Sequence, residues 1–288
     1  MDVYGMVNDR IIAVLEGGTI PWLKPWHGVQ GGARSHERGK PYSLLNQMLL
    51  GKPGEYLTFK QCQREGGKVR KGAKAKIVVF WRMTVRKIAD DNGETKEQSI
   101  PVLRYFNVFH IEDCEGIEPK YSDSTPLLAA TTDAAVEQIV NDYADRAKLT
   151  IENILQDEAY YSPVSHVVSL PLVEQFDDAA SYYDTAFHEL VHSTGHKSLL
   201  NRFNDGAKIA AFGSEDYSKE ELVAEIGSCS IMDALGLETK ATFRNNVAYI
   251  QSWIRALKND KRLLVSAASR ADKAVRLILS EVEGLENG

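Results

Sequence analysis

Cysteine is scarce in this chain of 288 residues. The three cysteines, Cys62, Cys114 and Cys229, are far apart, and none belongs to a Cys-x-x-Cys pair. This spacing excludes a disulfide framework and a cysteine-ligated zinc site, because both require several cysteines at short intervals. We therefore expect inert, reduced thiols in a protein of the cytoplasm.

Long hydrophobic runs are also missing. No stretch approaches the about eighteen apolar residues of a membrane-spanning helix. The N-terminal MDVYGMVNDRII has acidic residues where a secretory signal has a basic start and an apolar run. Both features predict a cytoplasmic protein with no membrane partner. Hydrophobic residues still make up 43% of the chain, which is enough to build two domains at this length.

Charge is distributed unevenly along the chain. Residues 1–110 contain 18 Lys and Arg against 10 Asp and Glu, whereas the remaining residues contain 16 against 30. The two parts therefore carry net charges of +8 and −14. Such a split predicts a basic module that meets a polyanion and an acidic module with another task.

The sequence HELVHSTGH at residues 188–196 holds three of the seven histidines. The preceding DDAASYYDTAF contains helix-forming alanines and no proline, and it offers Asp177 or Asp178 as an N-cap. Gly195 is typical of a residue that ends a helix. We therefore predict that the motif lies on a helix.

On such a helix, His188 and His192 lie on one face, one turn apart, so both imidazoles can reach one metal ion. Glu189 is offset from them, which suits a carboxylate that touches a metal-bound water rather than the metal, as the general base does in zinc peptidases. The alternative is a helix that merely carries solvated histidines.

A catalytic zinc usually has three protein ligands and one open position, so a third ligand is needed. His196 is one candidate, but it follows His188 by eight residues, two fewer than in metzincins. Glu221 and Glu225 in SKEELVAEIGS are four residues apart, so one can bind the metal while the other orients a ligand histidine. However, Ser218 and Glu221 also match a capping box, in which the glutamate only satisfies a helix N-terminus.

Residues 1–120 are predicted to form a small α+β domain. A helix over residues 3–16 precedes the proline-rich TIPWLKPWHG, and the strands AKIVVFWRMTVRK and VLRYFNVFHI are predicted to form a hairpin with a turn at Asn92-Gly93. The polar segment EDCEGIEPKYSDSTP then separates this domain from a mostly helical one at residues 126–288. The predicted fold class of the whole chain is α+β.

A basic segment covers much of the predicted hairpin and the loop before it. Between Lys60 and Lys87 there are ten Lys and Arg residues and one acidic residue, Glu65. Basic side chains bind phosphates, and nearby aromatic rings can stack on unpaired bases. The predicted contacts with single-stranded DNA are Trp22, Lys24, Trp26, Lys60, Lys68, Arg70, Lys71, Lys74 and Lys76.

The alternative is that the aromatic residues form the domain core and the lysines form a solvated face. For Phe80 we favour the core. Trp22 and Trp26 are harder to bury, because Pro21 and Pro25 keep their loop extended. The sequence contains no recognition helix, so we expect little preference among DNA sequences.

HELVHSTGH followed by ELVAE resembles the H-E-x-x-H and E-x-x-A-E motifs of gluzincin peptidases. That resemblance implies that Glu221 is the third zinc ligand and that Glu225 supports the site; His196 is a further candidate for a supporting residue. With HVVSLP and FGSEDYSKEELVAEIGS, the motif resembles the zincin-like domain of the ArdC antirestriction family of conjugative plasmids. IPWLKPW, PYSLLN and YLTFKQCQREGGKVRKGAKAKIVVFW are similar to that family's N-terminal domain, which binds single-stranded DNA.

The resemblance implies an antirestriction protein that binds single-stranded DNA and carries a zinc peptidase centre with Glu189 as the base. Such a protein protects incoming plasmid or mobile-element DNA, and its protein substrate would be a restriction or regulatory protein. Two alternatives remain open at this point. One is a non-catalytic DNA-binding accessory protein with a structural or vestigial metal site, and the other is a DNA-responsive peptidase that cleaves a repressor.

Overall fold

The computed structural model describes residues 2–22, 32–89, 95–121, 133–203, 215–237 and 247–279. The N-terminal half contains α1 (Val3–Glu16), β1 (Ala33–Ser35), α2 (Leu44–Leu50), β2 (Gly54–Leu57), α3 (Phe59–Arg64), β3 (Lys68–Val69), β4 (Lys76–Ala89), β5 (Thr95–His110) and β6 (Cys114–Glu115). The C-terminal half contains α4 (Asp133–Ala147), β7 (Thr150–Ile154), β8 (Tyr160–Ser162), β9 (Val167–Pro171), α5 (Ala179–Ser193), α6 (Glu215–Ala234), α7 (Val247–Asn259) and α8 (Leu263–Ile278). The α+β fold class is confirmed.

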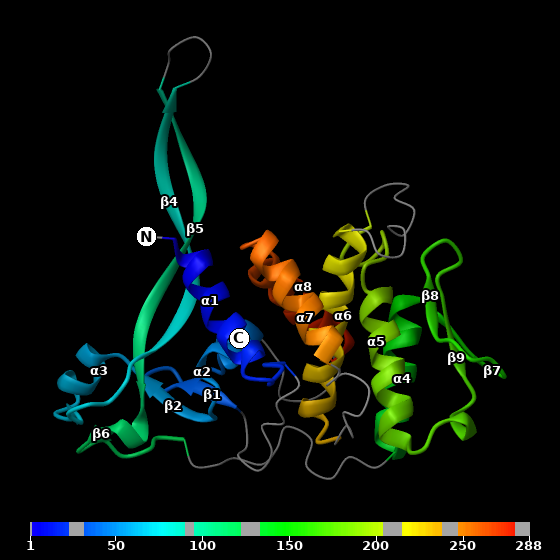
Figure 1. The fold of residues 1–288 in the computed structure, drawn as a ribbon, viewed down its shortest axis with the longest axis horizontal. Helices are drawn as coiled ribbons and strands as arrows, with labels where there is room; N and C mark the ends of the chain where they lie inside the picture. Colours follow the sequence, from blue (N-terminus) through cyan, green and yellow to red (C-terminus); the bar gives the residue numbers. More distant parts are fainter. Residues whose placement is uncertain are drawn as a thin grey trace.

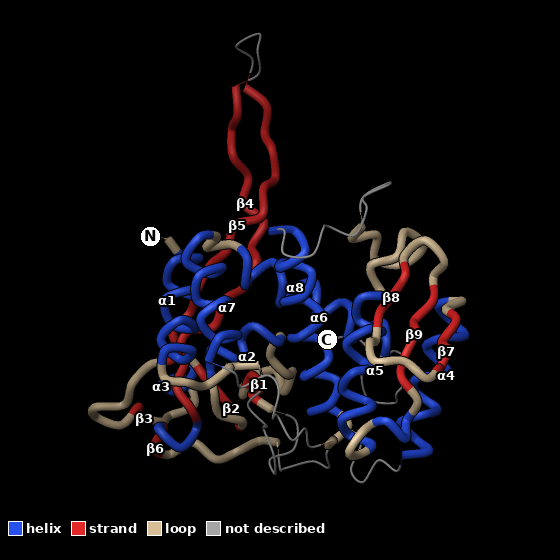
Figure 2. The backbone as a smooth tube through the Cα atoms, turned by 45° about the vertical axis from the view of Figure 1, so that its right-hand side comes forward, coloured by secondary structure: helices blue, strands red, loops and turns tan. Residues whose placement is uncertain are grey.

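Strands β4 and β5 form a long antiparallel hairpin that projects from the molecule (Figures 1 and 2). Its register pairs Lys76 with Val108 at the base and Ala89 with Thr95 at the far end. At the base it joins a sheet of order β1-β2-β5-β4, in which β2 pairs only with the last residues of β5. The outer part of the hairpin is therefore a two-stranded ribbon. The predicted Asn92-Gly93 turn lies outside the described residues.

The C-terminal half places α6 between α5 and α8, with the small sheet β7-β9-β8 on the far side of α5 (Figure 1). Helix α6 is apolar on several sides because neighbours cover it on both flanks, and Leu222, Val223, Ile226 and Ile231 are all fully buried. Strand β8 runs antiparallel to β9, and β7 runs parallel to it. This arrangement fixes α5 and α6 side by side.

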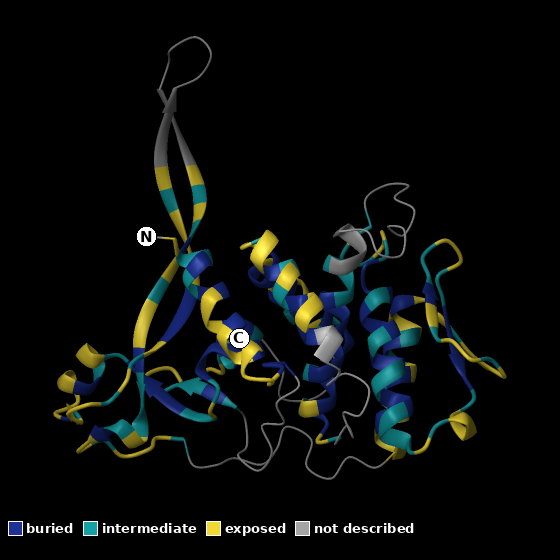
Figure 3. Ribbon diagram, in the orientation of Figure 1, coloured by how far each residue is buried: buried dark blue, intermediate teal, exposed yellow. Residues whose placement is uncertain are grey.

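The two halves share one continuous hydrophobic core. Buried residues of α1, α2 and β4 join those of the C-terminal helices in a single cluster (Figure 3). The Trp22 ring meets the Trp253 ring edge-on at 6.2 Å, and Asn8 Nδ2 donates to the Leu257 carbonyl at 2.5 Å. Separating the halves would expose this surface, so experiments on the protein require the full chain.

Most of the predicted elements are present. Helix α1 has the predicted bounds, the two hairpin strands overlap the predicted segments, and the described part of the C-terminal half is mostly helical, as predicted. Strand β7 was not predicted, because TIENI is short and largely exposed and so lacks an apolar pattern. In the described part of the chain, no helix has the length and apolar character needed to cross a membrane.

Gly227 sets the distance between α5 and α6. A Cβ atom at this position would lie 2.8 Å from Val191 Cγ2, and Val191 is fully buried. We expect Gly227→Ala to lower the free energy of unfolding by about 1 kcal/mol or more, because overpacking costs about 1–3 kcal/mol and outweighs the gain in helix propensity. Chemical denaturation measures this change. A variant as stable as the wild type would show that the two helices can move apart without cost.

Candidate metal centre

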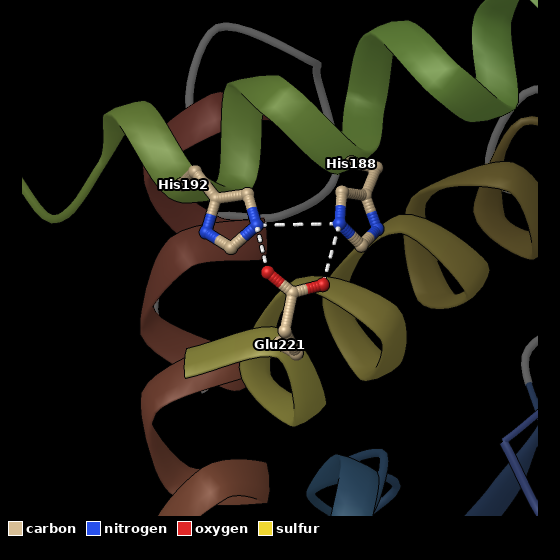
Figure 4. A group of neighbouring side chains, drawn as sticks. All are labelled: His188, His192 and Glu221. Atoms are coloured by element: carbon tan, nitrogen blue, oxygen red, sulfur yellow. Dashed lines mark hydrogen bonds and ion pairs between the residues drawn. The ribbon is translucent and has the colours of Figure 1, made fainter. Parts of the chain in front are cut away.

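Helix α5 carries the H-E-x-x-H motif in a fixed position. Asp178 caps its start, as predicted, by accepting hydrogen bonds from the Ser181 N–H and hydroxyl at 2.8 and 2.7 Å. At the other end, the Gly195 N–H donates to the His192 carbonyl. Both His188 and His192 face α6 from this helix (Figure 4).

Helix α6 supplies the third member of the group. It begins at Glu215, so Ser218 lies within its first turn and is not an N-cap. The capping-box alternative is therefore excluded. Glu221 points across to the two histidines of α5 (Figure 4).

The side chains of His188, His192 and Glu221 converge on one point. His188 Nε2 lies 3.5 Å from Glu221 Oε2, His192 Nε2 lies 3.4 Å from Glu221 Oε1, and the two Nε2 atoms are 3.2 Å apart. Ligand atoms about 2.0–2.1 Å from a tetrahedral ion lie about 3.3–3.4 Å from one another, so this spacing fits a divalent metal ion. The described residues contain no second cluster of this kind.

The electrostatics of the group also favour a cation. Burial opposes the charged form of His192, yet Glu220 and Glu221 raise its pKa to about 10. Burial likewise opposes ionisation of Glu221, but hydrogen bonds with both histidines lower the pKa of its carboxyl well below the usual range. The group therefore requires positive charge, which a divalent ion provides while neutral imidazoles bind it.

Glu189 follows His188 in α5 and is only 9% exposed. Its negative charge helps to raise the pKa of His192. Within the described ranges, however, its carboxylate accepts no hydrogen bond and forms no ion pair. A buried carboxylate without a partner is costly. Glu189 is therefore available to hold a water or a proton beside the metal ligands.

Glu220, which the sequence did not single out, lies behind one of the two histidines. Its Oε1 lies 3.6 Å from His192 Nδ1, the ring nitrogen that faces away from the metal-binding point. Arg202 holds Glu220 in place by donating from Nε at 3.1 Å and from Nη2 at 2.5 Å. The same guanidinium donates to the Thr194 hydroxyl and the Val191 carbonyl, which joins it to the end of α5. No spacing rule in the sequence links Arg202 to this site.

We expect Glu220→Gln to weaken metal binding about 10- to 100-fold, because residues that orient a ligand histidine typically contribute this much affinity. Competition with a chromophoric chelator measures the dissociation constant, and circular dichroism confirms that the variant is folded at the assay temperature. An unchanged dissociation constant in a folded variant would leave Glu220 with a purely structural role.

Of the two residues predicted to support the site, Glu225 lies beside the metal-binding group and His196 does not. Glu225 Oε1 lies 3.9 Å from His188 Nδ1, on the side of the ring that faces away from the metal-binding point. His196 instead stacks on His166, with ring centroids 4.0 Å apart, and its Nδ1 lies 2.7 Å from the Ser198 hydroxyl. The prediction that His196 supports the metal ligands is wrong, because the chain turns away after Gly195.

The predicted DNA contacts also need one correction. Trp22 is 7% exposed and packs on Trp253, so it belongs to the shared core and cannot stack on a base. The ring packs against Trp253 of α7, a helix from the other half of the chain, and local sequence cannot reveal this contact. Lys24 and Trp26 lie outside the described residues.

The predicted basic contacts are all exposed. These are Lys60, Lys68, Arg70, Lys71, Lys74 and Lys76. Arg70 lies 3.7 Å from Glu115, whereas the five lysines form no ion pair with any described residue. Their charges are therefore available to an anionic partner.

Phe80 was predicted to be buried but is exposed. It is 45% exposed on the hairpin, although we had favoured a core position. The prediction was wrong because at this position the helices cover only the opposite face of the hairpin, where Val79 and Leu103 are buried.

Two family models match the chain. Residues 1–109 match the N-terminal domain of the anti-restriction factor ArdC. Residues 135–270 match a zincin-like metallopeptidase, a fold that implies a bound metal. The metal-binding group described above lies within the second match.

Curated relatives show the same similarity in other contexts. Two proteins of Escherichia coli, each called DNA primase TraC, are 33% and 32% identical over 295 residues, which is 95% and 96% of this chain. The chain spans only 27% and 20% of their lengths. A Sinorhizobium fredii protein, y4eC, is 30% identical over 288 residues, which is 94% of this chain and 90% of the relative.

Solved structures extend the match to the complete fold. The metal-free crystal structure of the antirestriction protein ArdC from plasmid R388 is 33% identical, covers 100% of both chains and has a TM-score of 0.74. The Mn(II)-bound structure of the same protein is 32% identical, covers 99% of both chains and has a TM-score of 0.73. Because sequence and fold agree over the whole length, this chain belongs to the ArdC family of antirestriction proteins.

Proposed function

We propose that the protein binds single-stranded DNA through its N-terminal half, carries a zinc-dependent peptidase centre in its C-terminal half, and protects incoming plasmid DNA from restriction. The observation that carries the proposal is the group of His188, His192 and Glu221 with the unpartnered Glu189 beside it. The first three provide ligand atoms, and the fourth provides a base.

Zinc suits this donor set better than other common ions. Two imidazoles and one carboxylate form a typical catalytic zinc site, whereas manganese favours oxygen ligands. The Mn(II)-bound ArdC structure is evidence that a divalent ion binds to that relative. Among the described residues no fourth protein ligand completes the group, and His196, which could have closed it, faces His166. This open position favours a catalytic site over a structural one.

The chain's own residues have distinct parts in the proposed reaction. A zinc ion held by His188, His192 and Glu221 would polarise a peptide carbonyl and lower the pKa of a water molecule at the site. Glu189 accepts the proton of that water as the water attacks the carbonyl, and then delivers it to the leaving amine. The Glu220 carboxylate lies 3.6 Å from Nδ1 of His192 and the Glu225 carboxylate lies 3.9 Å from Nδ1 of His188, so each is placed to orient a ring whose Nε2 would bind the ion.

The DNA-binding part of the proposal rests on charge. The first 110 residues carry a net charge of +8, and the exposed lysines between Lys60 and Lys76 have no ion-pair partners among the described residues. Each phosphate contact releases counterions, which gives a salt slope of about 0.7 per contact on single strands. The match to the ArdC N-terminal domain supports the same assignment.

The full-length protein tests both parts together. Metal content is measured after purification without chelators, and a peptide library is then screened for cleavage with and without single-stranded DNA. We expect bound zinc, cleavage that a chelator abolishes, and DNA binding that weakens steeply as salt increases. A chain that neither contains nor takes up a divalent metal would refute the peptidase assignment, and tighter binding to duplex would refute the preference for single strands.

A further inference from the structure

The projecting hairpin has one face that the fold leaves open. Side chains alternate along each strand, and directly paired residues share a face. We call one of these the Phe80 face. It consists of Val78, Phe80, Arg82 and Thr84 of β4 with their partners Phe106, Arg104, Val102 and Ile100 of β5.

The opposite face is tied to the body of the molecule. Its base residues Ile77, Val79 and Leu103 belong to the shared core, and Trp81 meets Tyr4 of α1 edge-on with ring centroids 6.4 Å apart. The Phe80 face has a small core only at its foot. Beyond this point no described element packs on this face, and Phe80 and Phe106 are exposed there. Figures 2 and 3 show the two strands projecting from the rest of the fold.

Two phenylalanine rings form the centre of the Phe80 face. Phe80 is 45% exposed and Phe106 is 47% exposed, and their rings meet edge-on with centroids 6.0 Å apart. The Tyr42 ring contacts the Phe80 ring, with centroids 6.1 Å apart. Tyr42 in turn packs against the ring of the buried Tyr56. These edge contacts hold the rings in place while much of their surface stays open. Fixed aromatic rings bind a flat partner with little loss of conformational entropy.

Positive charge surrounds the two rings. Arg104 lies directly across from Phe80 in the neighbouring strand, Arg82 follows one step farther out, and both are exposed. At the foot of the face, Lys74 and Lys76 line a pocket of about 190 Å³, whose lining also includes the acidic Glu112 and Asp113. Glu112 is paired with Lys52, whereas Lys74 and Lys76 form no ion pair with a described residue. Residues 76–85 and 99–108 include no Asp or Glu. The face is therefore both aromatic and cationic.

We propose that the Phe80 face is the site where a single strand of nucleic acid lies on this protein. The bases stack on Phe80 and Phe106, and Arg82, Arg104, Lys74 and Lys76 contact the phosphates. The proposal rests on the proposed binding of single-stranded DNA and gives that function a location. Sheets that bind unpaired bases use this combination of exposed aromatic rings and basic groups.

Charge complementarity selects this occupant over an apolar protein surface. An apolar partner would leave the arginines desolvated and unpaired, which is costly, whereas a phosphate chain pairs with each of them. Duplex DNA fits less well, because its bases are already stacked on one another and cannot cover the phenylalanine rings.

Phe80→Ala and Phe106→Ala test the stacking part in the full-length protein. Binding is measured by fluorescence anisotropy with a labelled oligothymidylate and with an abasic phosphodiester of the same length. We expect each variant to bind the oligothymidylate about 5- to 150-fold more weakly and the abasic strand as well as the wild type does. Phe80→Trp should restore binding.

Arg104→Ala and Arg82→Ala test the phosphate contacts with the same two strands. Each should weaken binding to both, and each should reduce the salt slope by about 0.7. Met83→Ala is the matched control, because Met83 is exposed on the opposite face of the same hairpin. It should bind like the wild type.

The outcomes separate this site from the function on which it rests. If the wild-type protein binds no single strand, the proposed function fails and the site fails with it. If the wild type binds and the phenylalanine variants bind equally well, only the location is wrong. If sedimentation shows a wild-type dimer that Phe80→Ala dissociates without affecting oligonucleotide binding, the face is a contact between two copies and the proposal is overturned.

Discussion

His188→Ala should contain no metal after purification without chelators, whereas the wild-type protein should contain about one zinc per chain. The substitution removes one of three ligand atoms that lie 3.2–3.5 Å from one another. The remaining histidine and carboxylate cannot hold the ion in a chelating geometry. The loss of affinity should therefore exceed the about 10- to 100-fold loss that follows removal of a residue that only orients a ligand. Elemental analysis and zinc titration measure both quantities.

His196→Ala is the control for this experiment, because His196 belongs to the same nine-residue motif but contacts His166 and Ser198. It should keep the wild-type metal content. Equal metal content in His188→Ala and the wild type would contradict the ligand assignment. A loss of metal in His196→Ala would show that the third histidine approaches the ion when the metal binds.

Glu189→Gln should keep the metal and the fold and lose peptidase activity by about 100- to 10,000-fold, the usual contribution of a general base. The amide has nearly the same shape as the carboxylate but cannot accept the proton of the attacking water. Metal content, thermal unfolding and cleavage of a substrate from the peptide screen are measured on the same preparation. Peptidase activity close to wild type would mean that Glu189 is not the base.

The same variant shows which half of the protein provides protection. Plasmid transfer into a restricting host is measured with Glu189→Gln and with a variant in which Lys68, Arg70, Lys71, Lys74 and Lys76 are replaced by serine. We expect the basic-segment variant to lose protection, since this half must bring the second one to the DNA. Protection by Glu189→Gln would mean that DNA binding is sufficient, and its loss would mean that proteolysis is required. Full protection by the basic-segment variant would contradict the proposal that DNA binding by the N-terminal half is required for protection.

Features that depend on a few neighbouring residues could be predicted from the sequence. The spacing of His188 and His192 places them on one helical face wherever the helix packs, and Asp178 caps that helix by bonding to a residue three positions away. The bounds of α1 and the pairing of the two hairpin strands were predicted for the same reason. The resemblance to ArdC, carried by short motifs, was confirmed along the whole chain.

The burial of individual side chains and the contacts between distant ones could not be predicted in this way, because they depend on how the elements pack. Trp22 is buried because α7 covers it, and Phe80 is exposed because the helices pack on the opposite face of the hairpin. Glu221 faces the two histidines instead of capping a helix end, because α6 begins a turn and a half earlier. Arg202 bonds to Glu220 only because α5 and α6 lie side by side. Burial and long-range pairing depend on which surfaces the folded chain brings together, and a local pattern of residues does not contain that information.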